Sequence, residues 1–305
     1  MKSKKAIQLP FAWIFASLVG AFILFLAIYI SIRVINTGNM EMDLQTGTEI
    51  GILLNPLETS FQSSQKNSFS LPVETRIYAG CLEKGTFGLQ TIQISQMSFK
   101  KWTDTNSRVS FENKYIFSRN YSEGKTFYLF SKPFEMPFKV ADLFYLTSSK
   151  EKYCFIDAPE NIKEELDSLG QENIATKNCS VNSINVCFSA GNDCDIGVDY
   201  VGKVVAKKYN RFYFEGDALM YAAIFSEKQI YDCQLKRLMQ RTEQLSELYR
   251  DKSSLVSKED CNSNLELAAL AGLTGSFENQ GELVSISRIA EEIKQNNDLA
   301  DCRLW

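Results

Sequence analysis

The chain of 305 residues contains no histidine. Histidine is the base in Ser-His-Asp and Cys-His catalytic sites, a common zinc ligand and the side chain that titrates nearest neutral pH. Within this chain, its absence therefore excludes both kinds of nucleophilic site, histidine-ligated zinc and a histidine pH switch.

Positive charge is scarce beyond the N-terminus. Lys2, Lys4, Lys5 and Arg33 lie in the first 33 residues, which contain no acidic residue, and the rest of the chain has 29 basic against 37 acidic residues. Nucleic-acid phosphates are bound by clustered lysine and arginine, so the composition argues against a nucleic-acid partner. The 45% hydrophobic content predicts one membrane segment and a folded domain with a core of its own.

Residues 6–32 contain no charge at all, and these 27 residues would span about 40 Å as a helix, more than the roughly 30 Å hydrocarbon core of a bilayer. A cleaved secretory signal has a shorter apolar region and a small-residue exit. We therefore expect an uncleaved or N-terminally trimmed transmembrane helix with the bilayer as its partner. Because residues 1–5 carry the lysines, this flank is expected in the cytoplasm and residues 33–305 outside it.

Residues 4–16, KKAIQLPFAWIFA, resemble the class III signal of archaeal type IV pilin-like proteins. In that family a basic pair precedes a small residue and a glutamine, and a membrane peptidase cuts just ahead of the hydrophobic helix. The resemblance implies a cut near Gln8 that leaves the whole helix on the mature protein. Two departures bear on cleavage and on filament assembly, respectively: Ile7 precedes Gln8, and Ala12 stands where pilins usually carry an acidic residue. The rest of the chain is similar to single-pass membrane proteins of small-genome archaea, which implies no activity.

The sequence after the expected transmembrane helix predicts an α+β fold. Residues 33–54 are expected to continue helically until Pro56, and the polar residues 58–70 to form a linker, giving a juxtamembrane segment 33–70. An α+β domain is expected over 71–215. Its expected strands are residues 73–78, 91–94, 115–117, 126–130 and 153–156, and a further set over 183–214 broken by residues 191–193 and Gly197. A helix is expected after Pro159, with Ile162, Leu166 and Leu169 on one face and Gly170 at its end.

The last third, residues 216–305, is expected to be helical and to pack on the domain. Ser226 and Gln229 stand in the positions of a capping box. Helical spacing of apolar residues then predicts three stripes, which we interpret mainly as core. These stripes comprise Tyr231, Leu235, Leu238, Leu245 and Leu248, then residues 265–273, then Leu283, Ile286, Ile289 and Ile293.

All eight cysteines lie in the region expected outside the cytoplasm, and an even count there predicts disulfides. A four-cysteine metal site would usually show a CxxC pair, and the chain has none. Eight cysteines allow 105 pairings. Cys187 and Cys194 flank a turn, and Cys261 and Cys302 lie at helix ends that meet if the helices are antiparallel. The pairs Cys154–Cys179 and Cys81–Cys233 are then assigned by proximity and elimination.

Other candidate chemistry is sparse. Asp193, Asp195 and Gly197 resemble a fragment of a calcium loop, but a third ligand and the distal glutamate are missing, so an acidic turn is the preferred interpretation. Asn120 and Asn178 begin glycosylation sequons. Carboxylate pairs of the kind used in glycoside hydrolysis need only be close in space, and no Asp or Glu stands out.

No motif in the sequence names a reaction or a ligand, so no catalytic, cofactor-binding or metal residue is assigned and no cofactor is expected. The leading hypothesis is a non-enzymatic envelope or pilin-like protein that makes protein or polysaccharide contacts at the cell surface. One alternative is an anchored extracellular hydrolase that uses carboxylates, which a deep cleft with two carboxylates would favour. Another is an accessory subunit of a larger membrane complex, which an exposed hydrophobic helix face would favour.

Overall fold

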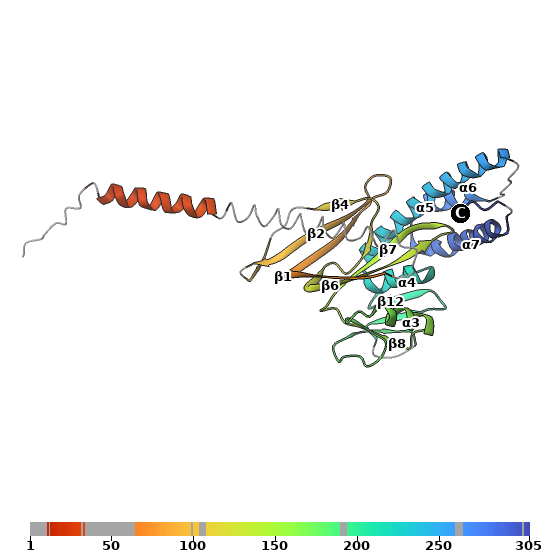
Figure 1. The fold of residues 1–305 in the computed structure, drawn as a ribbon, viewed down its shortest axis with the longest axis horizontal. Coiled ribbons are helices and arrows are strands. Elements are labelled where there is room, and N and C mark those ends of the chain that lie inside the picture. Colours follow the sequence, from red (N-terminus) through yellow and green to blue (C-terminus); the bar gives the residue numbers. More distant parts are fainter. Residues whose placement is uncertain are drawn as a thin grey trace, which may run out of the picture.

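The computed structural model describes residues 11, 13–31, 33, 65–98, 100–103, 108–189, 194–259, 265–300 and 302–305. The fold is α+β, as predicted, with an apolar N-terminal helix, two mixed sheets and a group of C-terminal helices (Figure 1). Most of the expected juxtamembrane helix and most of the expected linker lie outside the described residues.

The N-terminal helix Trp13–Ser31 is long and apolar enough to cross a membrane, and none of its apolar window is buried. Its 19 residues reach about 28 Å, close to the roughly 30 Å thickness of a hydrocarbon core. A core helix of a soluble protein would bury its apolar side chains. Here Phe11, Trp13 and Phe25 are all more than half exposed.

The large sheet has seven strands in the order β3-β2-β1-β6-β7-β5, with β4 also paired to β2. All its pairs are antiparallel except β5 with β7. The strands are β1 (Gln65–Leu82), β2 (Leu89–Ser98), β3 (Lys101–Trp102), β4 (Val109–Phe111), β5 (Tyr115–Phe117), β6 (Ser122–Glu135) and β7 (Lys139–Ser148).

The large sheet curls so that β5 approaches β2, although the two strands are far apart in the strand order. The backbone N–H of Ile116 in β5 donates to Oε1 of Gln90 in β2 at 2.8 Å. A separate hydrophobic cluster, including Ile92, Ile116 and Phe144, joins side chains from β1, β2, β5, β6 and β7. The curled sheet thus has a small core of its own.

The first strand begins earlier than predicted, because residues 65–70 belong to β1 rather than to the linker. This part pairs with β6, and Phe69 stacks on Phe127 with ring centroids 5.4 Å apart. Ser68 and Ser70 on either side are exposed. Polar composition was therefore misleading, since here it marks the exposed face of a strand whose single inward aromatic supplies the packing.

The small sheet has the strand order β13-β12-β11-β10-β8-β9, with β9, β8, β10 and β11 parallel. Its members are β8 (Tyr153–Ile156), β9 (Ile174–Ala175), β10 (Ile184–Cys187), β11 (Ile196–Asp199), β12 (Val204–Lys207) and β13 (Asn210–Tyr213). Helix α3 (Glu160–Leu169) connects β8 to β9, buries the three predicted residues and ends at Gly170, whose φ is 56°. Gly197 lies within β11, so it does not break a strand as expected.

Helix α4 (Gly216–Phe225) forms the centre of the main core, and every residue from Ala218 to Phe225 is buried. It contacts β6 and β7 of the large sheet and β12 of the small one (Figure 1). The prediction of a capping box is wrong. Ser226 is the C-cap residue of α4, and its hydroxyl donates to the carbonyl of Ala222 at 2.6 Å. Helix α5 (Lys228–Val256) begins after Glu227 instead.

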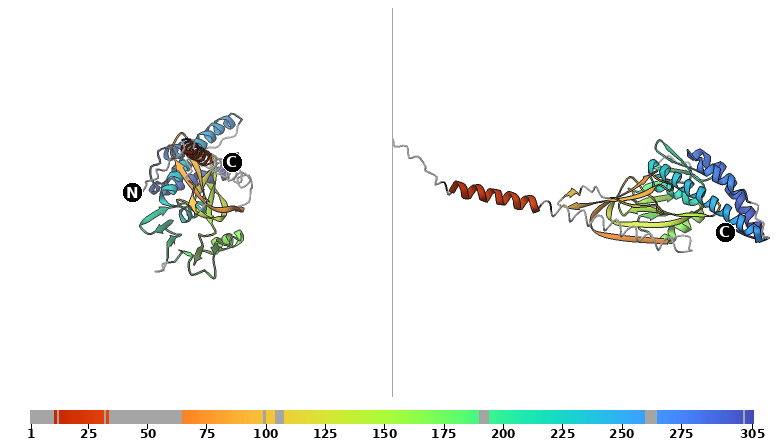
Figure 2. Two further views of the ribbon diagram at one scale, coloured as in Figure 1. Left: turned by 90° about the vertical axis from the view of Figure 1, so that its left-hand side faces the viewer. Right: turned by 90° about the horizontal axis from the view of Figure 1, so that it is seen from above.

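The remaining helices are α6 (Leu267–Gly275) and α7 (Leu283–Leu299), with short 3-10 turns η1 (Ser257–Glu259) and η2 (Gln280–Glu282). Figure 2 shows α5 and α7 together at one end of the strands. The predicted stripes are largely core, but Leu248 is 61% exposed. Seven residues further along α5, Leu255 is equally exposed, so the second half of this helix keeps part of its apolar face in solvent.

Candidate functional site

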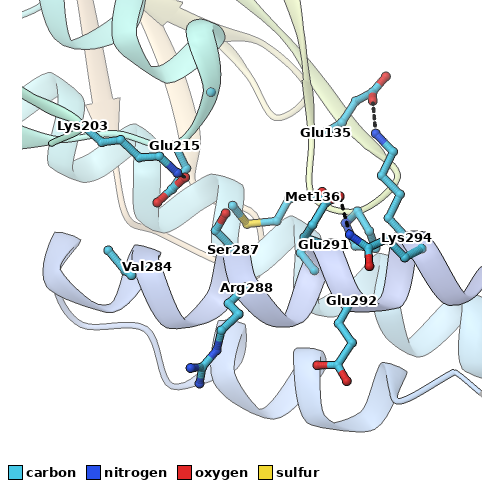
Figure 3. Close-up of a pocket in the computed structure, with 14 residues that line it drawn as sticks. Glu135, Met136, Lys203, Glu215, Val284, Ser287, Arg288, Glu291, Glu292 and Lys294 are labelled. Atoms are coloured by element: carbon cyan, nitrogen blue, oxygen red, sulfur yellow. Dashed lines mark hydrogen bonds and ion pairs between the residues drawn. The ribbon is translucent and has the colours of Figure 1, made fainter. Parts of the chain in front are cut away.

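A groove of about 720 Å³, called here the α7 groove, lies between the β6–β7 turn and helix α7 (Figure 3). Its third wall is the start of α4 with the β11–β12 turn. The lining side chains and glycine are Glu135, Met136, Pro137, Lys203, Glu215, Gly216, Val284, Ser287, Arg288, Ala290, Glu291, Glu292, Lys294 and Gln295.

The helix wall follows from the amphipathic sequence of α7. Leu283, Ile286 and Ile293 are buried, which turns the polar face toward the groove and solvent. On the opposite wall, the turn through Met136 and Pro137 is fixed by a hydrogen bond from the Met136 N–H to the Phe138 carbonyl at 2.8 Å.

Ion pairs line both ends of the α7 groove (Figure 3). Lys294 of α7 reaches Glu135 across the groove at 3.7 Å, and Lys203 pairs with Glu215 at the start of α4. Of the four carboxylates that line the groove, Glu135 and Glu215 each have a lysine partner, and Glu291 accepts a hydrogen bond from the side chain of Gln295 at 3.2 Å. The arrangement suits recognition of a polar partner that carries both signs of charge.

One buried carboxyl lies in a different hollow of about 360 Å³, beside Arg119 and Asn120. Burial raises the pKa of Glu151, which is 8% exposed. Its Oε2 accepts hydrogen bonds from the N–H of Ser148 at 2.9 Å and from the hydroxyl of Ser122 at 3.2 Å. These contacts join the end of β7 to the start of β6, so Glu151 stabilises the turns at this edge of the sheet.

A second polar cluster connects both sheets near the start of α4. Lys132 of β6 is 2.6 Å from Glu165 of α3 and 3.7 Å from Asp217 of α4. The hydroxyls of Tyr221 and Tyr200 donate to these carboxylates at 3.0 and 2.9 Å, respectively. Each carboxylate thus has two partners, as expected of a partly buried ion pair that positions α3 and α4 on β6.

Among the described cysteines, three of the four predicted pairs are disulfide-bonded: Cys81–Cys233, Cys154–Cys179 and Cys187–Cys194. Their Cα atoms are 6.1, 5.6 and 5.9 Å apart. Cys302 is disulfide-bonded as well, but Cys261 lies outside the described residues, so the pairing of these two stays a prediction.

The two sequons differ in accessibility. Asn120 and Asn178 are both exposed. The Ser122 hydroxyl of the first sequon is buried against Glu151, whereas Ser180 of the second is exposed. Glycosylation at both positions stays a prediction.

The calcium-like fragment is only partly described, because Asp193 lies outside the described residues. The carboxylate of Asp195 accepts the backbone N–H of Asn185 at 2.8 Å. In the described part of the chain, no group of three or more acidic or cysteine side chains is placed to hold a metal ion.

Sequence reasoning missed a polar contact of α5 with the large sheet, here called the α5 seam. Arg237, fully buried, donates to the carbonyls of Phe87, Lys114 and Glu112 and to the side chain of Gln234 at 2.7–2.9 Å. Gln234 in turn contacts Gln90 and the carbonyl of Ile116. A lone arginine on a helix face is usually solvated, and nothing in its local sequence distinguishes this one.

Comparison with known proteins returns no match for this chain, whether by family model, by curated protein sequence or by solved structure.

Proposed function

We propose that the protein is a membrane-anchored, extracytoplasmic interaction protein, with residues 1–5 in the cytoplasm and the α+β domain outside. The observation that carries this proposal is the exposed apolar helix Trp13–Ser31, followed by a domain in which three disulfides join described cysteines. Disulfides persist in oxidising compartments, and the basic flank of a membrane helix stays in the cytoplasm.

Labelling of one added cysteine in intact cells tests this topology. Val201 is 92% exposed in the β11–β12 turn, so Val201→Cys offers an accessible thiol. A membrane-impermeant maleimide should label Val201→Cys in intact cells. The matched variant Lys4→Cys should be labelled only after permeabilisation. The reverse pattern overturns the proposed orientation, and release of the protein by alkaline carbonate overturns the anchor.

The pilin-like N-terminus belongs to the same proposal, because a class III signal would leave the helix on the mature protein. N-terminal sequencing of protein purified from membranes should begin near Gln8. A start at Met1 excludes processing but keeps the anchor, whereas a start beyond Ile32 excludes the anchor.

The α7 groove is the surface that this proposal assigns to a protein partner. Its walls carry both signs of charge, as polypeptide surfaces do, and it lies on the folded domain rather than on the membrane helix. A photo-crosslinking residue at position 287 should capture a distinct protein in membranes, and the same residue at the exposed position 125 should not. Equal capture at both positions overturns the assignment. Capture of a second copy would instead indicate self-association.

A further inference from the structure

Among the residues that the structure describes, one face of the small sheet is exposed to solvent at β11, β12 and β13. A pocket of about 540 Å³ lies on it, here called the outer-face pocket, and it is lined by Phe188, Ser189, Gly197, Val198, Asp199, Val204, Ala206 and Arg211. All its lining residues come from β10–β13 and the turn residues next to them, so it is separate from the α7 groove.

The strand register explains the floor of this pocket. Gly197, Ala206 and Arg211 are direct cross-strand partners on three neighbouring strands, so their side chains share one face. A Cβ added to Gly197 would meet no atom within 4 Å. Two small residues beside a long one produce a flat, open floor with a guanidinium at its edge.

The positive charge at the edge of the pocket has no ion-pair partner among the described residues. Within the described part of the chain, neither Arg211 nor the neighbouring Lys208 forms an ion pair, although many other cations of the domain do. Lys208 and Tyr209 form the two-residue tip of the β12–β13 hairpin, and Tyr209 is 100% exposed. A basic and aromatic tip on an acidic domain attracts an anionic partner.

The same pocket also holds two side chains that can accept hydrogen bonds from the hydroxyl groups of a ligand. They narrow the chemical class of the partner further. The Asp199 carboxylate uses one oxygen for the N–H of Gly202, and the Ser189 hydroxyl donates to Asp157 at 2.7 Å, which leaves its lone pairs free to accept. The Asp199 carboxylate in the same pocket disfavours a ligand that carries negative charge alone, such as a lipid phosphate. It favours a ligand that donates hydroxyls and also carries a carboxylate, while Phe188 offers an apolar side to a sugar ring.

We propose that the outer-face pocket binds an acidic polysaccharide, with Arg211 on the sugar carboxylate and Asp199 and Ser189 on its hydroxyls. This inference rests on the proposed function for its biological context, since such polymers lie outside the cell. The pocket itself is independent of that topology. Binding to purified protein with failed labelling of Val201→Cys would therefore overturn the proposed function and leave the pocket standing.

The test is binding of the full chain in nanodiscs to polygalacturonate, with dextran, polyglutamate and phosphatidylglycerol vesicles as comparison probes. Polygalacturonate should bind, and Arg211→Ala should weaken it at least tenfold. Gly197→Val, which fills the floor without changing charge, should weaken it similarly. The matched control Arg303→Ala removes an exposed arginine elsewhere and should change affinity less than twofold, with all variants melting within a few degrees of the parent.

Each other outcome overturns the proposal. Equal loss in Arg211→Ala and Arg303→Ala indicates unspecific charge attraction. Equal binding of polyglutamate indicates an acidic polypeptide, and preference for the vesicles indicates a lipid surface. Unchanged affinity in Gly197→Val shows that the pocket is not the site, and absence of binding to polygalacturonate excludes this class of ligand.

Discussion

The α5 seam and the outer-face pocket each have an arginine, a glycine and a nearby disulfide, but the roles of these groups differ. In the seam, Arg237 is fully buried and makes four hydrogen bonds. On the outer face, Arg211 is exposed and forms no ion pair with any of the described residues. The first region uses its polar groups for stability, and the second leaves them available to a partner.

The glycines and disulfides repeat this contrast. Gly88 has a φ of 59° and lies against Arg237, whereas Gly197 faces open space. Cys81–Cys233 joins residues 152 positions apart and ties α5 to β1, whereas Cys187–Cys194 spans 7 positions next to the pocket. Matched substitutions in the two regions therefore test whether one is structural and the other functional.

Removing the disulfide of each region should give the largest difference in the free energy of unfolding. Replacing Cys81 and Cys233 by alanine should lower the free energy of unfolding by about 5 kcal/mol, because a long closed loop restricts the unfolded chain most. The pair Cys187 and Cys194 should account for about 2 kcal/mol. Urea unfolding of the domain in nanodiscs measures both. Equal losses would show that loop length does not decide their contributions.

Replacing the arginine of each region should give the second largest difference in the free energy of unfolding. Arg237→Met leaves the carbonyls of Phe87, Lys114 and Glu112 without their donor, and should lower the free energy of unfolding by roughly 3–5 kcal/mol. Arg211→Met should change it by less than about 0.5 kcal/mol, as for other exposed positions. Urea unfolding compares the two variants. A tolerated Arg237→Met would mean that water replaces the guanidinium in the seam.

Two adjacent lysines provide the third comparison. The amino group of Lys207 donates to the Ser226 carbonyl at 2.7 Å near Glu227 and Arg119, and burial lowers its pKa to about 7. Below pH 7 both folded and unfolded chains carry the proton, so the cost of burying the cation is fully present. Above pH 7 the folded chain loses it first, so the free energy of unfolding should rise toward pH 10.

Lys207→Met should abolish this rise and stabilise the protein at neutral pH, whereas Lys208→Met at the exposed tip should leave the pH profile unchanged. Thermal unfolding between pH 7 and 9.5 checks both, below the range in which the buried tyrosines titrate. An identical rise in all three proteins would show that another group causes it.

The sequence predicted the regular parts of this fold and missed the contacts between them. The apolar period of α3 and its final Gly170 identify the helix because local spacing and a left-handed cap determine it. Residues 65–70 were missed because their pairing with β6 depends on a strand about 60 positions away. Sequence patterns record which face is buried, but not which distant element buries it.

The candidate sites were still less predictable. Cysteine count and position predicted disulfides, but the pairs Cys81–Cys233 and Cys154–Cys179 followed only from proximity and elimination, because eight cysteines allow 105 pairings. In contrast, Arg237 and Arg211 look alike in sequence, and only the fold distinguishes them. Gly197, expected to end a strand, matters because it is the floor of the outer-face pocket.

The glycines should give the smallest effects and the sharpest test of the contrast. In Gly88→Ala, the new Cβ would lie 2.7 Å from both Cγ of Arg237 and the Leu82 carbonyl, at a positive φ. The Gly88→Ala substitution should therefore lower the free energy of unfolding by more than about 1 kcal/mol. Gly197→Ala places a methyl group in open space within a strand, and should raise the free energy of unfolding by about 0.5 kcal/mol. Urea titration resolves opposite signs of this size. A lower free energy of unfolding in both variants would mean that the space around Gly197 is as tightly packed as that around Gly88.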